Sequence, residues 1–92
     1  MKVEVRLLQE FLEMAGWHRR VFELPEGATV RDLLNMLPES VRERLLERGG
    51  DSIKWPAAVL VNGRRIEFLD GLNTRLKDGD VVVVSPRALF VV

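Results

Sequence analysis

The segment that decides the fold is Leu76-Lys77-Asp78-Gly79-Asp80-Val81-Val82-Val83-Val84. Its first half is typical of a tight turn, and the four valines that follow form an unbroken β-branched run. Such a run is typical of a strand that is covered on both faces. The segment therefore predicts a buried strand over residues 81–84 in the middle of a sheet.

The start of the chain predicts the neighbour of this strand. Val3, Val5 and Leu7 alternate with charged residues, which predicts a strand over Lys2 to Leu8 with one buried face. If the two ends of the chain share a ladder, no connection has to cross the sheet. We therefore expect residues 81–84 to pair with this first strand in parallel.

Residues 9–25 predict the rest of a wide hairpin. Gln9 to Gly16 has apolar residues at helical spacing and closes on a glycine that suits a helix C-terminal cap, so we expect one short helical turn. Strand character resumes over Val21 to Leu24. It stops at Pro25, because proline lacks the backbone donor that a ladder needs.

The middle of the chain predicts the helices that cover the sheet. Thr29 and Asp32 have the spacing of a capping box, so a helix is expected to begin at Val30. A second helical run is expected over Glu39 to Glu47, with Gly49-Gly50 as its C-terminal cap. Both runs carry apolar residues on one side, which we expect to pack across the sheet.

A second hairpin completes the predicted topology. Ala57 to Val61 and Arg65 to Ile66 flank Asn62-Gly63, a dipeptide that tolerates the positive φ angles of a type I′ turn. Residues 67–74 are expected to form a loop. The order hairpin, helix, hairpin, final strand predicts an α+β fold of the β-grasp type, with a mixed sheet of four to five strands and one main helix packed across it.

Composition limits the possible functions. A chain of 92 residues forms one domain with a modest core, which excludes a two-domain enzyme. The 14 basic and 14 acidic residues cancel, so net charge indicates no polyanionic partner. No stretch approaches the roughly 20 apolar residues of a membrane span, and the start alternates like a strand, so we expect a cytoplasmic protein and no membrane partner.

No catalytic, cofactor-binding or metal site is predicted, and we expect the chain not to be an enzyme. His18 is the only histidine and cysteine is absent, so the sequence offers no histidine cluster or thiolate site. Asp78-Gly79-Asp80 lacks the ligand spacing of a calcium loop and is expected to form a turn. Ser52 and Ser85 lie in no nucleophile motif, and Ser85 before Pro86 is typical of a strand end.

Several segments together resemble the MoaD-like and ThiS-like sulfur carriers of the ubiquitin superfamily. Residues 23–34 (ELPEGATVRDLL) resemble the entry to the helix of that family, and residues 59–64 (VLVNGR) and 76–82 (LKDGDVV) resemble its closing strands. The MoaD-like branch, the small subunit of molybdopterin synthase, matches better through residues 11–16 (FLEMAG) and 64–72 (RRIEFLDGL). The resemblance implies a ubiquitin-like β-grasp fold.

The resemblance also divides the chain. It extends from Met1 to about Pro86, which predicts a β-grasp domain over residues 1–86 and an apolar C-terminal tail over residues 87–92. In that family the terminal glycine is adenylated and converted to a thiocarboxylate, and its sulfur is delivered to a molybdopterin precursor. Here the glycine positions fall near Leu89 and Phe90, and the sequence ends at Val92. Side chains of this size are expected to obstruct passage through a narrow channel.

The tail is expected to be buried against a surface. Ala88 to Val92 has high β propensity and no charged side chain, so it is poorly suited to water. Two alternatives stay open: packing on its own domain, or burial against a second copy or in a partner's groove. Trp17 and Trp55 offer further contact area. The predicted partner-binding residues are Pro86, Arg87, Leu89, Phe90, Val91 and Val92.

Three functional hypotheses follow. The first is a MoaD-like protein of molybdopterin or tungstopterin biosynthesis that binds a partner without catalysis; the partner resembles the synthase large subunit or an activating enzyme, or is a second copy bound through the tail. The second is a genuine sulfur carrier or protein modifier. The third is an RNA-associated module similar to TGS domains, suggested by Arg19-Arg20 and Arg64-Arg65 but disfavoured by the neutral net charge unless both pairs share a face.

Overall fold

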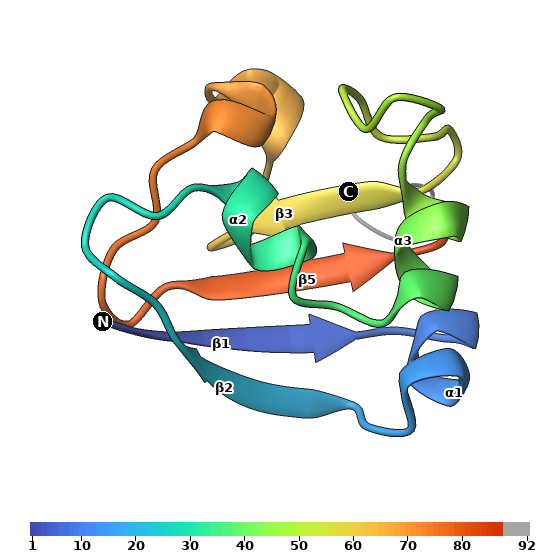
Figure 1. The fold of residues 1–92 in the computed structure, drawn as a ribbon, viewed down its shortest axis with the longest axis horizontal. Coiled ribbons are helices and arrows are strands. Elements are labelled where there is room, and N and C mark those ends of the chain that lie inside the picture. Colours follow the sequence, from blue (N-terminus) through green and yellow to red (C-terminus); the bar gives the residue numbers. More distant parts are fainter. Residues whose placement is uncertain (88–92) are drawn as a thin grey trace.

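Strand β5 (Val81–Ser85) is the centre of the sheet in a computed structural model that describes residues 1–87 (Figure 1). The sheet has the strand order β2-β1-β5-β3-β4, with β5 parallel to β1 and antiparallel to β3. The other strands are β1 (Lys2–Leu7), β2 (Arg19–Glu23), β3 (Ala58–Val61) and β4 (Arg64–Arg65). The predicted central strand and its parallel pairing with the first strand are confirmed.

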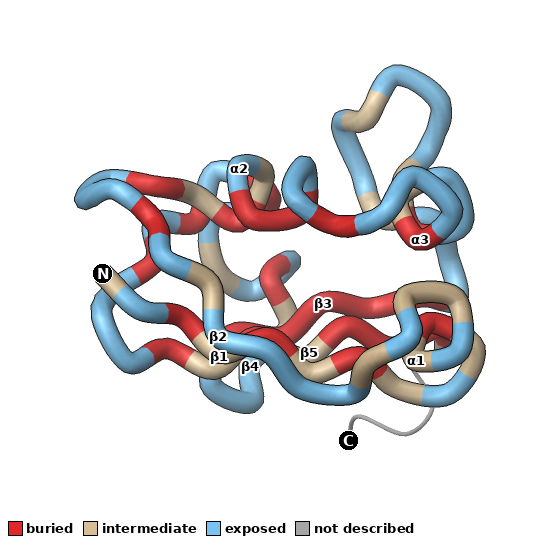
Figure 2. The backbone as a smooth tube through the Cα atoms, turned by 60° about the horizontal axis from the view of Figure 1, so that its bottom comes forward, coloured by how far each residue is buried: buried red, intermediate tan, exposed pale blue. Residues whose placement is uncertain are grey.

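Short helices connect the strands of this sheet. They are α1 (Glu10–Ala15), α2 (Val30–Leu34) and α3 (Glu39–Leu45), with two 3₁₀ helices, η1 (Ile66–Phe68) and η2 (Gly71–Asn73). Figure 2 shows α2 and α3 in a layer beside the sheet, with buried residues on the surfaces that face each other. The predicted β-grasp fold, a mixed sheet with the main helix packed across it, is confirmed. Among residues 1–87, none of the helices has the length and hydropathy that a membrane span requires.

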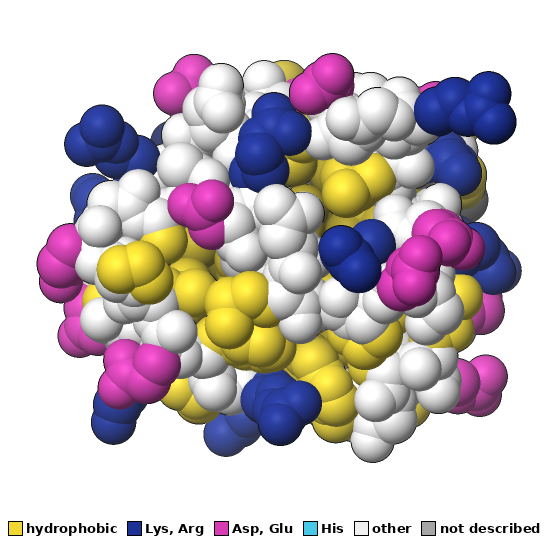
Figure 3. Space-filling model, in the orientation of Figure 1, with side chains coloured by type: hydrophobic (Ala, Val, Ile, Leu, Met, Phe, Trp, Pro, Cys, Tyr) yellow, Lys and Arg dark blue, Asp and Glu magenta, His cyan; other side chains and the backbone are white. Residues whose placement is uncertain are grey.

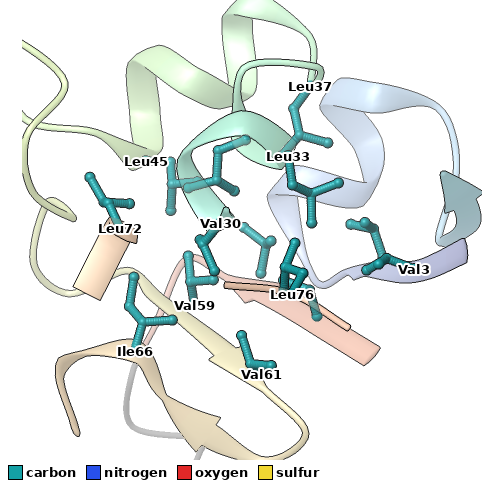
Figure 4. Packing of buried hydrophobic residues seen from close by; sticks show 14 of the residues in the cluster. Val3, Val30, Leu33, Leu37, Leu45, Val59, Val61, Ile66, Leu72 and Leu76 are labelled. Carbon is teal, nitrogen blue, oxygen red and sulfur yellow. The ribbon is translucent and has the colours of Figure 1, made fainter. Parts of the chain in front are cut away.

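The core lies between α2 and the inner face of the sheet. Leu33 of α2 and Val3 of β1 are 0% exposed and extend into the same interior (Figure 4). Each fully buried side chain of this size stabilises the fold by about 1.5 to 3 kcal/mol relative to its exposed state. The core members labelled in Figure 4 are Val3, Val30, Leu33, Leu37, Leu45, Val59, Val61, Ile66, Leu72 and Leu76.

The start of α2 is fixed by the predicted capping box. The Thr29 hydroxyl oxygen accepts a hydrogen bond from the Asp32 backbone amide at 3.3 Å, and the Asp32 carboxylate accepts one from the Thr29 amide at 2.9 Å. Two amides that no helical carbonyl can reach thus gain partners. The prediction that the helix begins at Val30 is confirmed.

The predicted end of the second helical run is wrong. α3 ends at Leu45, and Leu46 is already extended and forms an isolated bridge with Ile53. Leu46 and Ile53 are both half-buried against the core, so the chain leaves the helix early to place them there. Gly49-Gly50 therefore lies in the following loop, with φ angles of 96° and 76°, and does not cap the helix.

The predicted loop over residues 67–74 is also wrong in part. η1 and η2 occupy most of it, and they bury Ile66 and Leu72. The predicted strand over Arg65 to Ile66 is also corrected. β4 ends at Arg65, and Ile66 begins η1, because the Ile66 side chain, which is 2% exposed, packs in the core. The Thr74 hydroxyl donates to the Gly71 carbonyl at 2.7 Å and closes the turn.

The valine run is covered fully on only one of its faces. Val82 and Val84 are 0% exposed against the helices, whereas Val81 and Val83 are half-buried on the outer face. On that face Val83 packs against the small cluster formed by Ala58 and Leu60 of β3. The expectation of a strand covered on both faces is therefore corrected, because α2 and α3 lie on the inner face of the sheet (Figure 2).

The second hairpin depends on Asn62. Asn62 and Gly63 have φ angles of 51° and 85°, as a type I′ turn requires. The Asn62 side-chain amide donates to the Asp80 carboxylate at 2.9 Å, and its oxygen accepts from the Val81 amide at 2.9 Å. Asn62 thus joins the β3–β4 turn to the start of β5.

Replacing Asn62 by alanine is expected to lower the free energy of unfolding by about 2 to 3 kcal/mol. The loss combines an unpaired acceptor at buried Asp80 with the lower tolerance of alanine than of asparagine for a positive φ. Urea unfolding measures it, with Asn35→Ala, an exposed asparagine in right-handed conformation, as the matched control. Equal midpoints for the two variants would show that the Asn62 contacts contribute nothing.

Candidate partner-binding site at the end of strand β5

The chain turns sharply after β5. Ser85 is 1% exposed, and its hydroxyl donates to the Arg87 carbonyl at 3.0 Å and accepts from the Arg87 amide at 3.2 Å. Pro86 between them is buried. The prediction that Ser85 marks the strand end is confirmed, and the two hydrogen bonds hold the backbone of residues 85–87 in this turn.

The Arg87 side chain is bonded to the start of α1. Its Nη1 donates to Gln9 Oε1 at 2.6 Å and to Glu10 Oε1 at 2.8 Å. The second oxygen of Glu10 lies 3.5 Å from Nη2 of Arg44 on α3. One carboxylate therefore links the end of β5 to two helices that are distant in sequence.

The hydrogen bond from Arg87 lowers the pKa of Glu10 below its usual value of 4.5. A backbone hydrogen bond and the charges of Arg87 and Arg44 act in the same direction, and they outweigh the partial burial that opposes them. Glu10 is therefore ionised near neutral pH and holds both arginines.

Replacing Glu10 by glutamine is expected to reduce the dependence of stability on acid pH. Because the pKa of Glu10 is lower in the folded chain, its ionised form stabilises the fold above pH 4.5, and this contribution disappears as pH falls through the lowered folded value. Urea midpoints from pH 7 to pH 2 should converge for wild type and Glu10→Gln at the acid end. Glu13→Gln on the same helix is the control, and an undiminished difference at pH 2 would contradict the expectation.

A hollow of ≈ 180 Å³ opens beside this ion-pair network. Phe11, which is 1% exposed, and Trp55, which is 68% exposed in the loop before β3, both line it. Its lining combines apolar rings with charged groups. The lining residues are Glu10, Phe11, Arg44, Lys54, Trp55, Pro56, Ala57, Pro86 and Arg87.

The structure brings two of the predicted partner-binding residues, Pro86 and Arg87, to this hollow. Leu89, Phe90, Val91 and Val92 lie outside the described residues. Sequence reasoning missed Glu10 and Arg44, because their contacts with each other and with Arg87 join distant parts of the chain and leave no local pattern. Of the two tryptophans expected to add contact area, Trp55 lines the hollow. Trp17 lies elsewhere and packs against Phe22, with 5.8 Å between the ring centroids.

The other polar residues considered from the sequence have structural partners. His18 lies in a bend before β2 with Nδ1 3.0 Å from the Leu7 carbonyl oxygen. Asp78 accepts a hydrogen bond from the Lys2 amide at 2.7 Å, and Asp80 accepts one from the Lys77 amide at 2.8 Å, as expected of turn residues. Within residues 1–87, no three histidine, cysteine or acidic side chains are grouped as metal ligands.

The two arginine pairs do not converge. Arg19-Arg20 belongs to β2 and Arg64-Arg65 to β4, which are the opposite edges of the sheet. Nε of Arg19 lies 3.7 Å from Oε2 of Glu4, and Nη2 of Arg65 lies 3.5 Å from Oε2 of Glu67. Figure 3 shows basic and acidic side chains interspersed on the face that it draws. These two pairs therefore do not form the shared basic face that would favour RNA binding.

Comparison with known proteins agrees with this architecture. The model of the ThiS family matches residues 5–86. Small archaeal modifier protein 3 of Haloferax volcanii is 37% identical over 89 residues, which cover 94% of this chain and 95% of that protein. The structure of a putative molybdopterin converting factor, subunit 1, from Pyrococcus furiosus is 34% identical, with a TM-score of 0.72 over 95% of this chain and 98% of that one.

A third comparison concerns the fold alone. The crystal structure of small archaeal modifier protein 1 from Haloferax volcanii superposes with a TM-score of 0.79 at 24% identity, over 94% of this chain and 97% of that chain. The resemblance noted in the sequence is thus confirmed by a family match over most of the chain and by relatives of nearly equal length. The chain belongs to the ThiS family and has the ubiquitin-like β-grasp fold of the MoaD-like sulfur carriers and small protein modifiers.

Proposed function

We propose that this chain is a non-catalytic, partner-binding member of its family that serves molybdopterin or tungstopterin biosynthesis. The partner is a protein similar to the large subunit of molybdopterin synthase or to an activating enzyme. The observation that carries the proposal is the attachment of Arg87 to Gln9 and Glu10 at 2.6 and 2.8 Å. Because the start of the tail is held in one place, a partner meets the tail and the neighbouring Trp55 together.

The proposed contact residues extend from this attachment along the tail. We assign residues 1–86 to the domain and residues 87–92 to the tail, since β5 ends at Ser85 and the family match ends at residue 86. Arg87 belongs to the tail by this division, although its side chain is bonded to the domain. The proposed partner-binding residues are Pro86, Arg87, Leu89, Phe90, Val91 and Val92.

Side-chain size favours binding over sulfur transfer. Glycine residues pass through a narrow channel with little steric hindrance, whereas by the count from Pro86 the glycine positions of the family fall near Leu89 and Phe90 here. Apolar side chains of this size stabilise a contact by their burial. The link to the molybdopterin pathway is supported by the name of the Pyrococcus furiosus relative, a putative molybdopterin converting factor subunit.

A second candidate function is that of a sulfur carrier or protein modifier. The observation that favours it is the 37% identity to a protein named small archaeal modifier protein 3. In that case the end of the chain is activated chemically in spite of its bulky residues. Mass measurement of the activated chain distinguishes the two functions.

Reversing the charge of Arg87 is expected to weaken partner binding by about tenfold or more. Arg87→Glu places a second carboxylate against Glu10 and releases the start of the tail from its fixed position. Titration calorimetry with the purified synthase large subunit and, separately, with the activating enzyme measures the change. Arg64→Glu, an exposed arginine on the far edge strand, is the control. Equal weakening by both variants would contradict a specific role for Arg87.

A further inference from the structure

We infer that the hollow beside β5 is a docking site for a partner segment that presents one apolar side chain next to a carboxylate. The inference rests on the proposed function and names the chemistry of the partner. A run of apolar side chains such as that of the tail gives little specificity by itself, whereas a second contact of defined shape and charge lets the chain distinguish one partner from others. The hollow lies where a partner that engages the tail also reaches the domain, since Pro86 and Arg87 line it.

The size of the hollow fits one side chain. Its volume is ≈ 180 Å³, and an apolar cavity of about 150 Å³ is known to hold a benzene molecule. Phe11 at 1% exposed, together with Pro56 and buried Pro86, supplies an apolar lining. Trp55 also lines the hollow and is 68% exposed, and tryptophan is among the residue types enriched in the side chains that dominate binding energy.

The charges around the hollow favour a partner segment that carries an acidic residue. Three cations and one carboxylate line it, namely Arg44, Lys54, Arg87 and Glu10, which leaves two net positive charges. Glu10 is already engaged by both arginines, at 2.8 and 3.5 Å. Lys54 donates to the Glu43 backbone carbonyl at 3.0 Å, and within residues 1–87 no carboxylate lies within 4.0 Å of it. A carboxylate of the partner therefore complements Lys54.

Charge also decides between the possible occupants. No side chain of residues 88–92 is acidic, so their only negative group is the carboxylate at Val92, which offers less charge to the cationic rim than an acidic segment does. A segment from a different protein with an aromatic or branched side chain beside aspartate or glutamate matches both the apolar lining and the charge. We therefore assign the hollow to such a partner segment.

Trp55 fluorescence provides the test. In a Trp17→Phe background Trp55 is the only tryptophan, and Trp17 itself lies outside the hollow. The full chain is titrated with blocked peptides Gly-Asp-Phe-Asp-Gly, Gly-Lys-Phe-Lys-Gly and Gly-Asp-Ala-Asp-Gly. We expect a saturable change with the first peptide and affinities at least about tenfold weaker with the other two. Lys54→Glu should weaken the first peptide about tenfold, and the exposed Lys77→Glu should not.

Several results would overturn the inference. Equal affinity for all three peptides, or equal behaviour of the Lys54 and Lys77 variants, would exclude the proposed chemistry. Tighter peptide binding by about tenfold after replacement of residues 89–92 by serine would show that the tail itself occupies the hollow. A chain that binds its partner protein but no peptide would contradict this inference alone, whereas a chain that binds the acidic peptide but neither partner protein would contradict the proposed function alone.

Discussion

A chain shortened to end at Arg87 is expected to lose at least about 100-fold in affinity for its protein partner while its unfolding midpoint stays unchanged. Burial of one large apolar side chain contributes about 1.5 to 3 kcal/mol, and 100-fold corresponds to about 2.8 kcal/mol. The loss of Leu89 and Phe90 together therefore accounts for the change. The domain keeps β5, which ends at Ser85, and the Arg87 contacts with Gln9 and Glu10.

Calorimetry with the partner and urea unfolding measure the two halves of this prediction. Replacing residues 89–92 by serine in the full-length chain is the matched variant, because it removes the apolar side chains and keeps the length. It should bind as weakly as the shortened chain. Unchanged affinity would place the partner contacts elsewhere, and a clearly lower unfolding midpoint would show that the tail stabilises its own domain. A smaller oligomer after shortening would identify a second copy as the tail's partner.

Replacing Leu33 by alanine is expected to lower the free energy of unfolding by about 3 to 4 kcal/mol. Leu33 is 0% exposed at the centre of the packing between α2 and the sheet (Figure 4), so its removal leaves a cavity that the neighbours fill only in part. A domain of this size has only about 5 to 15 kcal/mol of stability, so the loss is a large fraction of the total.

Urea unfolding of Leu33→Ala beside Met36→Ala provides the comparison. Met36 follows α2 and is 50% exposed, so its truncation should change the stability by no more than about 0.5 kcal/mol. A loss below about 1 kcal/mol for the Leu33 variant would contradict the position of α2 as the helix that closes the core.

The parts of the fold that were predictable carry their signal locally. Alternation of apolar and charged residues identified β1, the Thr29–Asp32 spacing identified the start of α2, and Asn62-Gly63 identified the hairpin turn. The sequence order of these elements then left few ways to connect them, which fixed the parallel pairing of β1 with β5.

The errors occurred where tertiary packing overrides local preference. Leu46 leaves the helical conformation because it pairs with Ile53 and packs on the core, although its own sequence continues a helical pattern. The short 3₁₀ helices η1 and η2 bury Ile66 and Leu72. A helix of three residues is too short for apolar residues to repeat at a regular spacing, so the sequence gives no signal for it.

Of the candidate site, only Pro86 and Arg87 were predictable from the sequence. The apolar character of the tail indicated a contact surface that begins at Pro86 and Arg87. The Glu10 contacts with Arg87 and Arg44 depend on the sheet bringing residues far apart in the sequence together, so they appear only in the folded chain. The same is true of the position of Trp55 beside the exit of the tail.

Intact-mass spectrometry tests most directly whether this chain binds a partner or carries sulfur. The chain is incubated with ATP, the activating enzyme and a sulfur source, beside a ThiS-family protein that ends in two glycines and must gain sulfur under the same conditions. We expect the mass of this chain to stay unchanged while it still binds its partner. Exchange of one oxygen for sulfur at its terminal carboxyl group, or a trapped adenylate there, would contradict the proposed function.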